Sequence, residues 1–142
     1  MALLEKQLFL KKSGLPGAGK GLFTKMEIPK GTVIVEYKGR IHTWDEIKHE
    51  DGINGYLYYV NSKNVIDAKP YKKALGRYAN DAMGWARVEG LRNNAEYVEI
   101  KKRCYIKSTR RIEKGQEIFV GYGREYWQMM KRHEDKPKRR RQ

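Results

Sequence analysis

Short runs of alternating or β-branched residues recur along most of the chain. Gly, Pro, Asn or Lys-rich positions bound each run, and runs of this length with such boundaries are typical of β-strands. The pattern predicts seven strands, at Gln7–Lys11, Thr32–Tyr37, Tyr56–Val60, Val65–Asp67, Tyr97–Ile100, Cys104–Ser108 and Glu117–Tyr122. Asn61–Asn64 predicts a hairpin turn between two of them. The chain is therefore expected to be mainly β.

Three short helices interrupt this pattern. Thr43 and Glu46 have the spacing of a capping box, which predicts a helix that opens at Thr43. A second helix is expected over Tyr71–Tyr78, after Pro70, and a third over Glu125–His133. No repeat of fixed period is present, so the pattern favours a single β domain with a few helical turns.

The length of the chain also indicates one domain. A chain of 142 residues is long enough to bury a core of its own. We assign residues 1–130 to this domain and residues 131–142 to a basic C-terminal tail. The tail holds seven basic and two acidic side chains, and blocks of like charge repel one another and rarely pack. We therefore expect it to be disordered.

Few residues are available for disulfides or metal sites. Cys104 is the single cysteine, and with three scattered histidines it falls short of a zinc constellation. Glu5 and Lys6 interrupt the apolar start, and no apolar run has the length of a membrane span. The expectation is a metal-free, soluble, cytoplasmic protein with no membrane contact, or a nuclear one if the source cell has a nucleus. The oligomeric state stays open.

The net charge of +14 favours contact with polyanions or acidic partners. Three interpretations of the basic tail remain open: a solubilising end, a nucleic-acid contact and a nuclear import signal. Within the domain, Asp45, Glu46, Glu50 and Asp51 form an acidic stretch. It is either a solvated helix face or a patch that attracts a basic substrate.

Gly14–Gly21 nearly satisfies the pattern of a phosphate-binding P-loop. Such a loop needs a hydroxyl just after its lysine and a helix that follows. Gly21 and Leu22 stand where the hydroxyl is required, and Pro29 and Gly31 oppose a helix there. We therefore expect a tight turn between strands and no nucleotide hydrolysis or phosphoryl transfer.

Four further motifs follow this turn in a fixed order. They are GLFTKMEIPKGTVIVEYKG, GRYANDA, NNAEY and EIFVGYGREYW. Together they resemble the SET-domain family of protein lysine methyltransferases, from about Leu8 to Trp127. The resemblance implies small curved sheets around a C-terminal pseudoknot. It also implies S-adenosylmethionine as the methyl donor, S-adenosylhomocysteine as the product and a protein lysine as the acceptor.

The resemblance assigns the cofactor to three distant segments that should meet. The residues implied are Ala18, Gly19, Lys20, Gly21, Leu22, Tyr78, Asn80, Asp81, Tyr122 and Trp127. Asp81 stands where the family usually has histidine and Ala82 where it usually has serine. The cysteine-rich zinc segment that follows the YG motif in many histone-directed members is replaced by Tyr126-Trp127 and basic residues, so the histone specificity of those members does not transfer.

The same resemblance assigns the catalytic role to tyrosines. Tyr122 matches the tyrosine beside the transferring methyl group, and Tyr37 and Tyr97 match positions that line the lysine channel. A tyrosine in a strand is ordinarily a half-buried packing residue, so we rank Tyr122 first, Tyr37 second and Tyr97 third. Methyl transfer to an amine needs positioning and an unprotonated lysine rather than a metal or a nucleophilic residue. The alternative is an inactive SET-like or other basic β module that binds nucleic acid or chromatin.

Overall fold

The computed structural model describes residues 3–84, 87–123 and 126. In these residues, nine strands pair into three small antiparallel sheets. The first sheet has the order β1 (Leu8–Lys12), β2 (Lys20–Thr24), β9 (Glu117–Ile118). The second has the order β3 (Val33–Glu36), β8 (Arg103–Ser108), β7 (Ala95–Ile100). The third has the order β4 (Arg40–His42), β6 (Asn64–Asp67), β5 (Leu57–Asn61). The expected mainly β class is confirmed.

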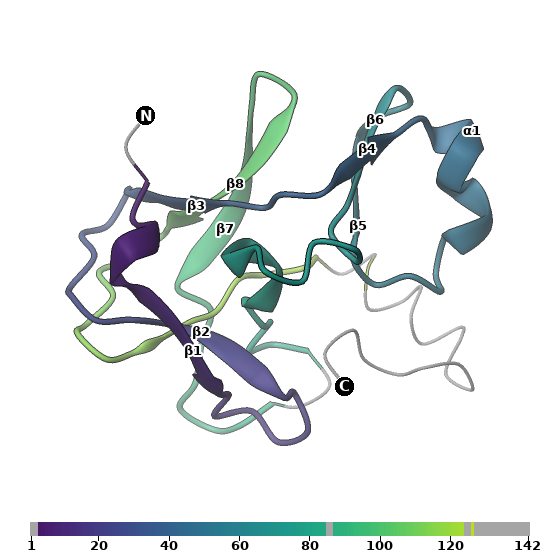
Figure 1. Cartoon of the computed structure of the whole chain (residues 1–142). Helices are drawn as coiled ribbons and strands as arrows, with labels where there is room; N and C mark the ends of the chain where they lie inside the picture. The colour runs from purple at the N-terminus through teal and green to yellow at the C-terminus, as the bar shows by residue number, and fades with distance from the viewer. Residues whose placement is uncertain (1–2, 85–86, 124–125, 127–142) are drawn as a thin grey trace.

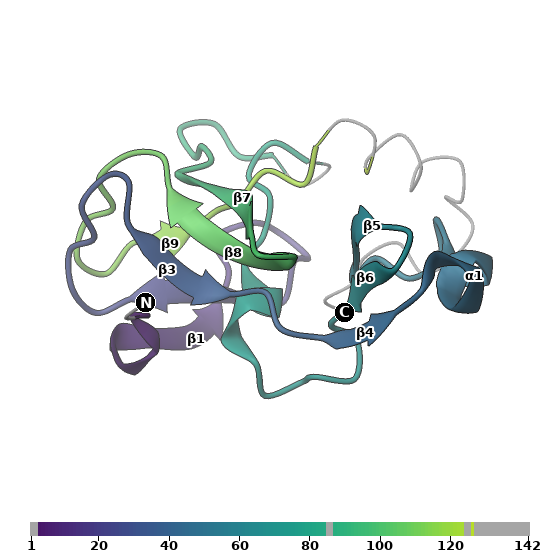
Figure 2. The same ribbon diagram turned by 90° about the horizontal axis from the view of Figure 1, so that it is seen from above.

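The helical elements are short. They are α1 (Trp44–Ile47) and the 3-10 helices η1 (Glu5–Gln7), η2 (Lys48–Glu50) and η3 (Leu75–Tyr78). The capping box that predicts α1 is present, because Thr43 Oγ1 accepts from Glu46 N while Glu46 Oε1 accepts from Thr43 N. The sheet β4–β6–β5 and α1 lie together at one end of the molecule, away from the other two sheets, in both views (Figures 1 and 2).

The main core lies between the first two sheets and is made of aliphatic side chains. Its buried members are Leu8, Leu22, Ile28, Ile34, Val35, Ala79, Ala95, Ile106, Ile112, Ile118 and Val120. A second buried cluster, which joins the second and third sheets, contains Tyr37, Tyr56, Ile66, Ala68 and Cys104. Burial of this much apolar surface is the main stabilising term of the fold. The tyrosines of the second cluster bring aromatic rings to the junction between sheets.

The segment after β9 runs through the middle of the molecule. Phe119 forms a parallel bridge with Asn80, and Val120 forms one with Ala95. Val120 N donates to Asn80 O at 2.9 Å, and Ala95 N donates to Phe119 O at 3.0 Å. This segment therefore lies between two earlier parts of the chain, which is where the expected pseudoknot requires it.

One helix prediction is wrong in its extent. The helix expected over Tyr71–Tyr78 is present only as η3, and the residues before it form hydrogen-bonded turns. Gly76 packs against the main chain of Glu36 and Arg77 is buried, so long-range packing sets the local conformation. Strands β2 and β4 were not predicted. The helix expected over Glu125–His133 and the tail at 131–142 lie outside the described residues, Tyr126 excepted.

Candidate active site

The loop between β1 and β2 is a tight glycine turn. Ser13 N donates to Gly19 O at 2.8 Å, and Gly17 and Gly19 both have φ of 71°, a conformation that favours glycine. The loop leads directly into strand β2, which begins at Lys20. Because a strand follows where a P-loop needs a helix, the expectation of a turn between strands is confirmed.

Glu117 ties this turn to the rest of the site. Its buried carboxylate accepts from Ser13 Oγ at 2.7 Å, from Gly14 N at 2.9 Å and from Asn80 Nδ2 at 3.5 Å. A Cβ at Gly21 would collide with the same carboxylate. Sequence reasoning missed Glu117 as a site residue, since a lone glutamate in a short strand gives no signal of its burial.

Asn80 joins the glycine turn to the C-terminal segment. Its side-chain Nδ2 donates to Lys20 O at 3.1 Å, while its main-chain oxygen accepts from Val120 N. The residue is buried, as are Ala18 and Leu22 of the turn. The structure thus brings together the glycine turn, the segment that contains Asn80 and the segment after β9.

The Asp81 carboxylate acts as a clamp within the protein. Its Oδ2 accepts from Tyr122 N at 2.9 Å, and its Oδ1 accepts from Asn93 Nδ2 at 2.9 Å and Met83 N at 2.8 Å. Asn93 Oδ1 in turn accepts from Ala82 N. Asp81 therefore positions the main chain of Tyr122, and Asn93 is a supporting residue that the sequence pattern did not indicate.

The hydroxyl of Tyr122 lies against the main chain of the residue before Asn80. It donates to Ala79 O at 2.7 Å. Tyr78 is placed differently, because its hydroxyl donates to Lys72 O at 2.6 Å and its ring lies 5.3 Å from the guanidinium carbon of Arg77. Trp127, the last residue assigned to the cofactor, lies outside the described residues.

Tyr122 belongs to a run of contacting aromatic rings, which we call the tyrosine cluster: Tyr37, Tyr58, Tyr97, Tyr122 and Tyr126. Tyr97 is central, with ring-centroid distances of 5.6 Å to Tyr37, 5.3 Å to Tyr58 and 6.4 Å to Tyr122. Tyr126 packs on the other side of Tyr122 at 4.9 Å. The three tyrosines assigned a catalytic role are thus brought together, and Tyr58 and Tyr126 extend the cluster.

Tyr58 and Cys104 stay protonated in this environment. Burial raises the pKa of the Tyr58 phenol well above its usual value, and the neighbouring Cys104 and Glu99 raise it further. Burial also raises the pKa of the Cys104 thiol. The Tyr58 hydroxyl donates to Glu99 Oε2 at 3.0 Å. The cluster therefore presents a neutral phenol at Tyr58 at physiological pH. Because the chain has ten tyrosines, sequence spacing did not single out Tyr58.

The site is rich in hydrogen-bond acceptors and neutral aromatic rings. Acceptor oxygens of Lys20, Ala79 and Asp81 lie where the three segments meet, and each accepts a hydrogen bond from Asn80 or Tyr122. Among the described residues, no group of three or more His, Cys, Asp or Glu side chains is placed to hold a metal ion. Within the same residues, no helix has the length and apolar character to cross a membrane.

Comparison with known proteins agrees with this geometry. The SET domain family model matches residues 19–123. The histone-lysine N-methyltransferase set-1 of Caenorhabditis elegans is 29% identical over 119 residues, which cover 74% of this chain and 46% of that protein. The histone-lysine N-methyltransferase EZH2 of Chaetomium thermophilum is 28% identical over 130 residues, which cover 83% of this chain and 8% of that protein.

Solved structures show the same relationship. The methyltransferase domain of human PR domain-containing protein 2 matches with a TM-score of 0.60 and 25% identity, covering 82% of this chain and 77% of that one. The chain spans less than half the length of the two curated relatives described above. The family match begins at Gly19, at the end of the glycine turn, and includes Asn80 and Tyr122. With its three small sheets and its motifs in family order, the chain belongs to the SET-domain family.

Proposed function

We propose that this chain transfers a methyl group to the side-chain nitrogen of a lysine in a protein substrate. The observation that carries the proposal is the position of Tyr122, whose hydroxyl is held by Ala79 O beside Asn80 and whose ring stacks on Tyr97. SET domains use S-adenosylmethionine as the methyl donor. The relatives described above are named as histone-lysine methyltransferases, which supports a lysine acceptor.

The residues present suit such a cofactor. When bound, S-adenosylmethionine supplies a methyl group on a positively charged sulfur. Asn80 and Tyr122 hold Lys20 O, Ala79 O and the Asp81 carboxylate in place, which fixes the three segments around the proposed cofactor position. The glycine turn, with φ of 71° at Gly17 and Gly19, leaves its main chain open to close approach. We therefore assign the cofactor to the junction of the glycine turn, Asn80 and Tyr122.

The tyrosine cluster suits the acceptor lysine. The partly buried rings of Tyr58 and Tyr97 offer apolar surface for an alkyl stem, and the fully buried Tyr37 packs against both of them. Burial of an amine disfavours its charged form and lowers its pKa. A lysine inside the cluster thus becomes a neutral nucleophile without a general base from the protein.

The Ala79 carbonyl sets the chemical role of the Tyr122 hydroxyl. Because the phenolic proton is engaged at 2.7 Å with Ala79 O, the phenolic oxygen acts toward other groups as an acceptor. An acceptor beside a polarised methyl group stabilises it by weak C–H hydrogen bonding. Tyr122 therefore orients the transferred group and takes no part in proton transfer.

The acidic stretch is a less direct guide to the substrate. Asp45 pairs with Lys48 at 3.3 Å, and Glu50 accepts from Asn54 Nδ2 at 2.8 Å. Glu99 lies at the edge of the tyrosine cluster, because it accepts a hydrogen bond from Tyr58. It is the acidic group that we place nearest to an entering lysine.

We propose a cytoplasmic location, or a nuclear one where the cell has a nucleus. We also propose that the basic tail at 131–142 contributes a nucleic-acid contact.

A transfer assay with the full chain tests this proposal. The enzyme and methyl-labelled S-adenosylmethionine are incubated with proteins of a cell lysate, and labelled products are located by mass spectrometry. We expect methylation on lysine. A peptide built around the labelled site accepts methyl groups, and the same peptide with arginine in place of that lysine does not. Cofactor binding with no methylated product in any protein would overturn the proposal in favour of a binding module.

A further inference from the structure

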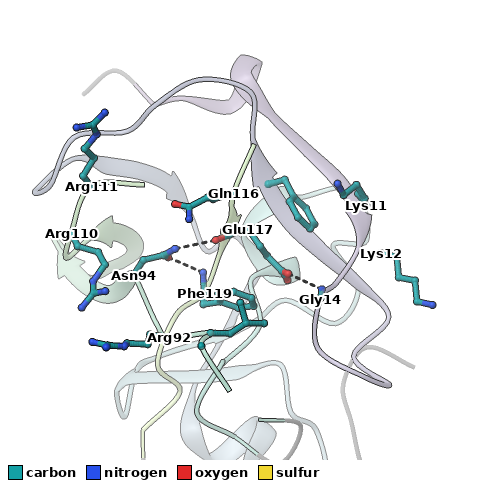
Figure 3. A pocket seen from close by; sticks show the side chains of 13 residues that line it. Lys11, Lys12, Gly14, Arg92, Asn94, Arg110, Arg111, Gln116, Glu117 and Phe119 are labelled. Atoms are coloured by element: carbon teal, nitrogen blue, oxygen red, sulfur yellow. Dashed lines mark hydrogen bonds between the residues drawn. The ribbon is translucent and has the colours of Figure 1, made fainter. Parts of the chain in front are cut away.

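A hollow lies on the first sheet, and Gly14 and Glu117 of the site described above form part of its wall. It has a volume of about 690 Å³ and is lined by five cationic side chains, which we call the basic pocket: Lys11, Lys12, Arg92, Arg110 and Arg111. Figure 3 shows Lys11 and Lys12 on one side of the hollow and the three arginines on the other. None of the residues assigned to the cofactor lines it.

Four of these cations form no ion pair with a carboxylate of the residues that the structure describes. Arg111 pairs with Glu27 at 2.9 Å and Glu113 at 3.3 Å. The cations without an ion pair are all exposed, and they are Lys11, Lys12, Arg92 and Arg110. Like charges held near one another repel. An anion bound between these cations would therefore reduce their electrostatic repulsion.

The other polar groups of the pocket are already engaged within the protein. Asn94 Nδ2 donates to Glu117 O, and Asn94 Oδ1 accepts from Phe119 N, both at 2.9 Å (Figure 3). Gln116 Oε1 accepts from Glu113 N at 2.7 Å, and the Glu117 carboxylate holds Ser13 and Gly14. The groups left to a ligand are therefore chiefly the cations, with the amide Nε2 of Gln116 beside them.

We infer that the basic pocket binds the phosphodiester backbone of a nucleic acid. Arginine guanidinium groups and lysine ammonium groups on opposite walls suit a chain of regularly spaced phosphates that passes between them. The contact is made to the backbone rather than to bases, because Phe23 and Phe119 are buried and offer no face for stacking. Recognition at this pocket is thus independent of nucleotide sequence.

An acidic peptide suits the pocket less well. Strand β1 is the edge of its sheet, and the charged Lys11 and Lys12 on it oppose the addition of another strand. Both polar atoms of the Asn94 side chain are engaged and Gln116 Oε1 is occupied, which leaves few neutral partners for a peptide main chain. Phosphates need only the cations, so the nucleic acid is the ligand that these contacts favour.

A charge-matched pair of full-length variants tests the inference. One variant carries Lys12→Gln, Arg92→Gln and Arg110→Gln in the basic pocket. Its control carries Arg40→Gln, Lys63→Gln and Lys69→Gln, which remove the same charge from exposed positions outside the pocket. Binding of labelled duplex DNA, duplex RNA and polyglutamate is followed by fluorescence anisotropy over a range of salt concentrations.

We expect the pocket variant to bind nucleic acid about tenfold or more weakly at physiological salt. Its slope of log affinity against log salt should fall by about 2–3, since each phosphate contact contributes about 0.9. The control variant keeps most of the affinity and slope. The DNA and RNA arms show which nucleic acid is preferred. Turnover on a short peptide stays the same in both variants, which separates this inference from the proposed function.

Two results would overturn the inference. Equal weakening in the pocket and control variants would mean that only total charge matters. Tight binding of polyglutamate with none of either duplex would make the pocket a site for acidic proteins. Because the substituted side chains are exposed, unchanged melting temperatures confirm that each variant is folded.

Discussion

The phenol of Tyr122 donates its proton to the main-chain oxygen of Ala79, 43 residues earlier in the chain, at 2.7 Å. Two segments distant in sequence are joined at the atom that is proposed to act on the methyl group. The same pair of segments is joined a second time by Asp81 Oδ2, which accepts from Tyr122 N. Tyr122 is therefore fixed at both its main chain and its hydroxyl.

Replacement Tyr122→Phe should keep the fold and most of the cofactor affinity while turnover falls. A hydroxyl that matters chiefly in the transition state lowers kcat and kcat/KM together. We expect a loss of about tenfold to hundredfold, equivalent to about 1.4–2.7 kcal/mol. Steady-state kinetics on a methylatable peptide measures it. Tyr59→Phe, at an exposed tyrosine outside the cluster, is the control, and a wild-type rate in Tyr122→Phe would contradict the catalytic assignment.

Removal of the Asn80 side chain as Asn80→Ala should weaken cofactor binding by about 1.5–3 kcal/mol, the range for hydrogen bonds to a charged group. Part of the loss comes from the turn, because Asn80 Nδ2 no longer holds Lys20 O. Titration calorimetry with S-adenosylmethionine measures the affinity. Asn61→Ala, in the β5–β6 turn, should leave it unchanged. If the folded Asn80→Ala protein keeps the wild-type affinity, Asn80 is not a cofactor-binding residue.

Gly21→Ala should damage both stability and the cofactor site. The new Cβ would meet the Glu117 carboxylate, which must then move away from Ser13 and Gly14. Overpacking of this kind costs about 1–3 kcal/mol, and thermal unfolding measures it. Gly14→Ala is a matched control, because its Cβ would lie 3.6 Å from Glu117 Oε1, an ordinary contact. Equal stability of the two variants would show that Glu117 is not a rigid support.

The pKa shifts of Tyr58 and Cys104 predict a loss of stability in alkali. Folding raises both pKa values above the ordinary values of 10.0 for the phenol and 9.0 for the thiol, so the unfolded chain releases these protons at lower pH than the folded chain. Their contribution is complete below about pH 9 and is lost as the pH rises above it. Denaturant unfolding from pH 7 to pH 11 should show this decline, and Tyr58→Phe should make it shallower. A decline of the same steepness in that variant would assign it to other groups.

The alternation of apolar and polar residues predicted most of the strands. It failed for strands that are buried on both faces or are too short to show alternation. Strand β2 is buried at four of its five positions, so it lacks the alternation of a half-exposed strand. Strand β4 has three residues, too few for any period. Residues 71–74 form turns because η3 is positioned by the buried Gly76 and Arg77, a long-range effect that local propensity does not contain.

The part of the site that could be predicted from the sequence is the part formed by the family motifs. The motifs that contain Gly19, Asn80 and Tyr122 indicated which segments meet. The residues that hold them could not be found in this way, because Glu117 and Asn93 act through hydrogen bonds to partners at least 11 residues away. Tyr58 was hidden for a simpler reason, since one tyrosine among ten carries no positional signal.

The hydrogen bonds of Glu117 to Ser13 and Gly14 span 104 and 103 residues, which has a consequence for synthesis of the protein. A ribosome adds about 5–20 residues per second, so the glycine turn emerges seconds before the carboxylate that holds it. During that interval a nascent chain has no cofactor site. Contacts between such distant residues also slow folding. Cofactor uptake therefore requires synthesis to have passed Glu117, and a product shortened before this residue would be inert toward the cofactor.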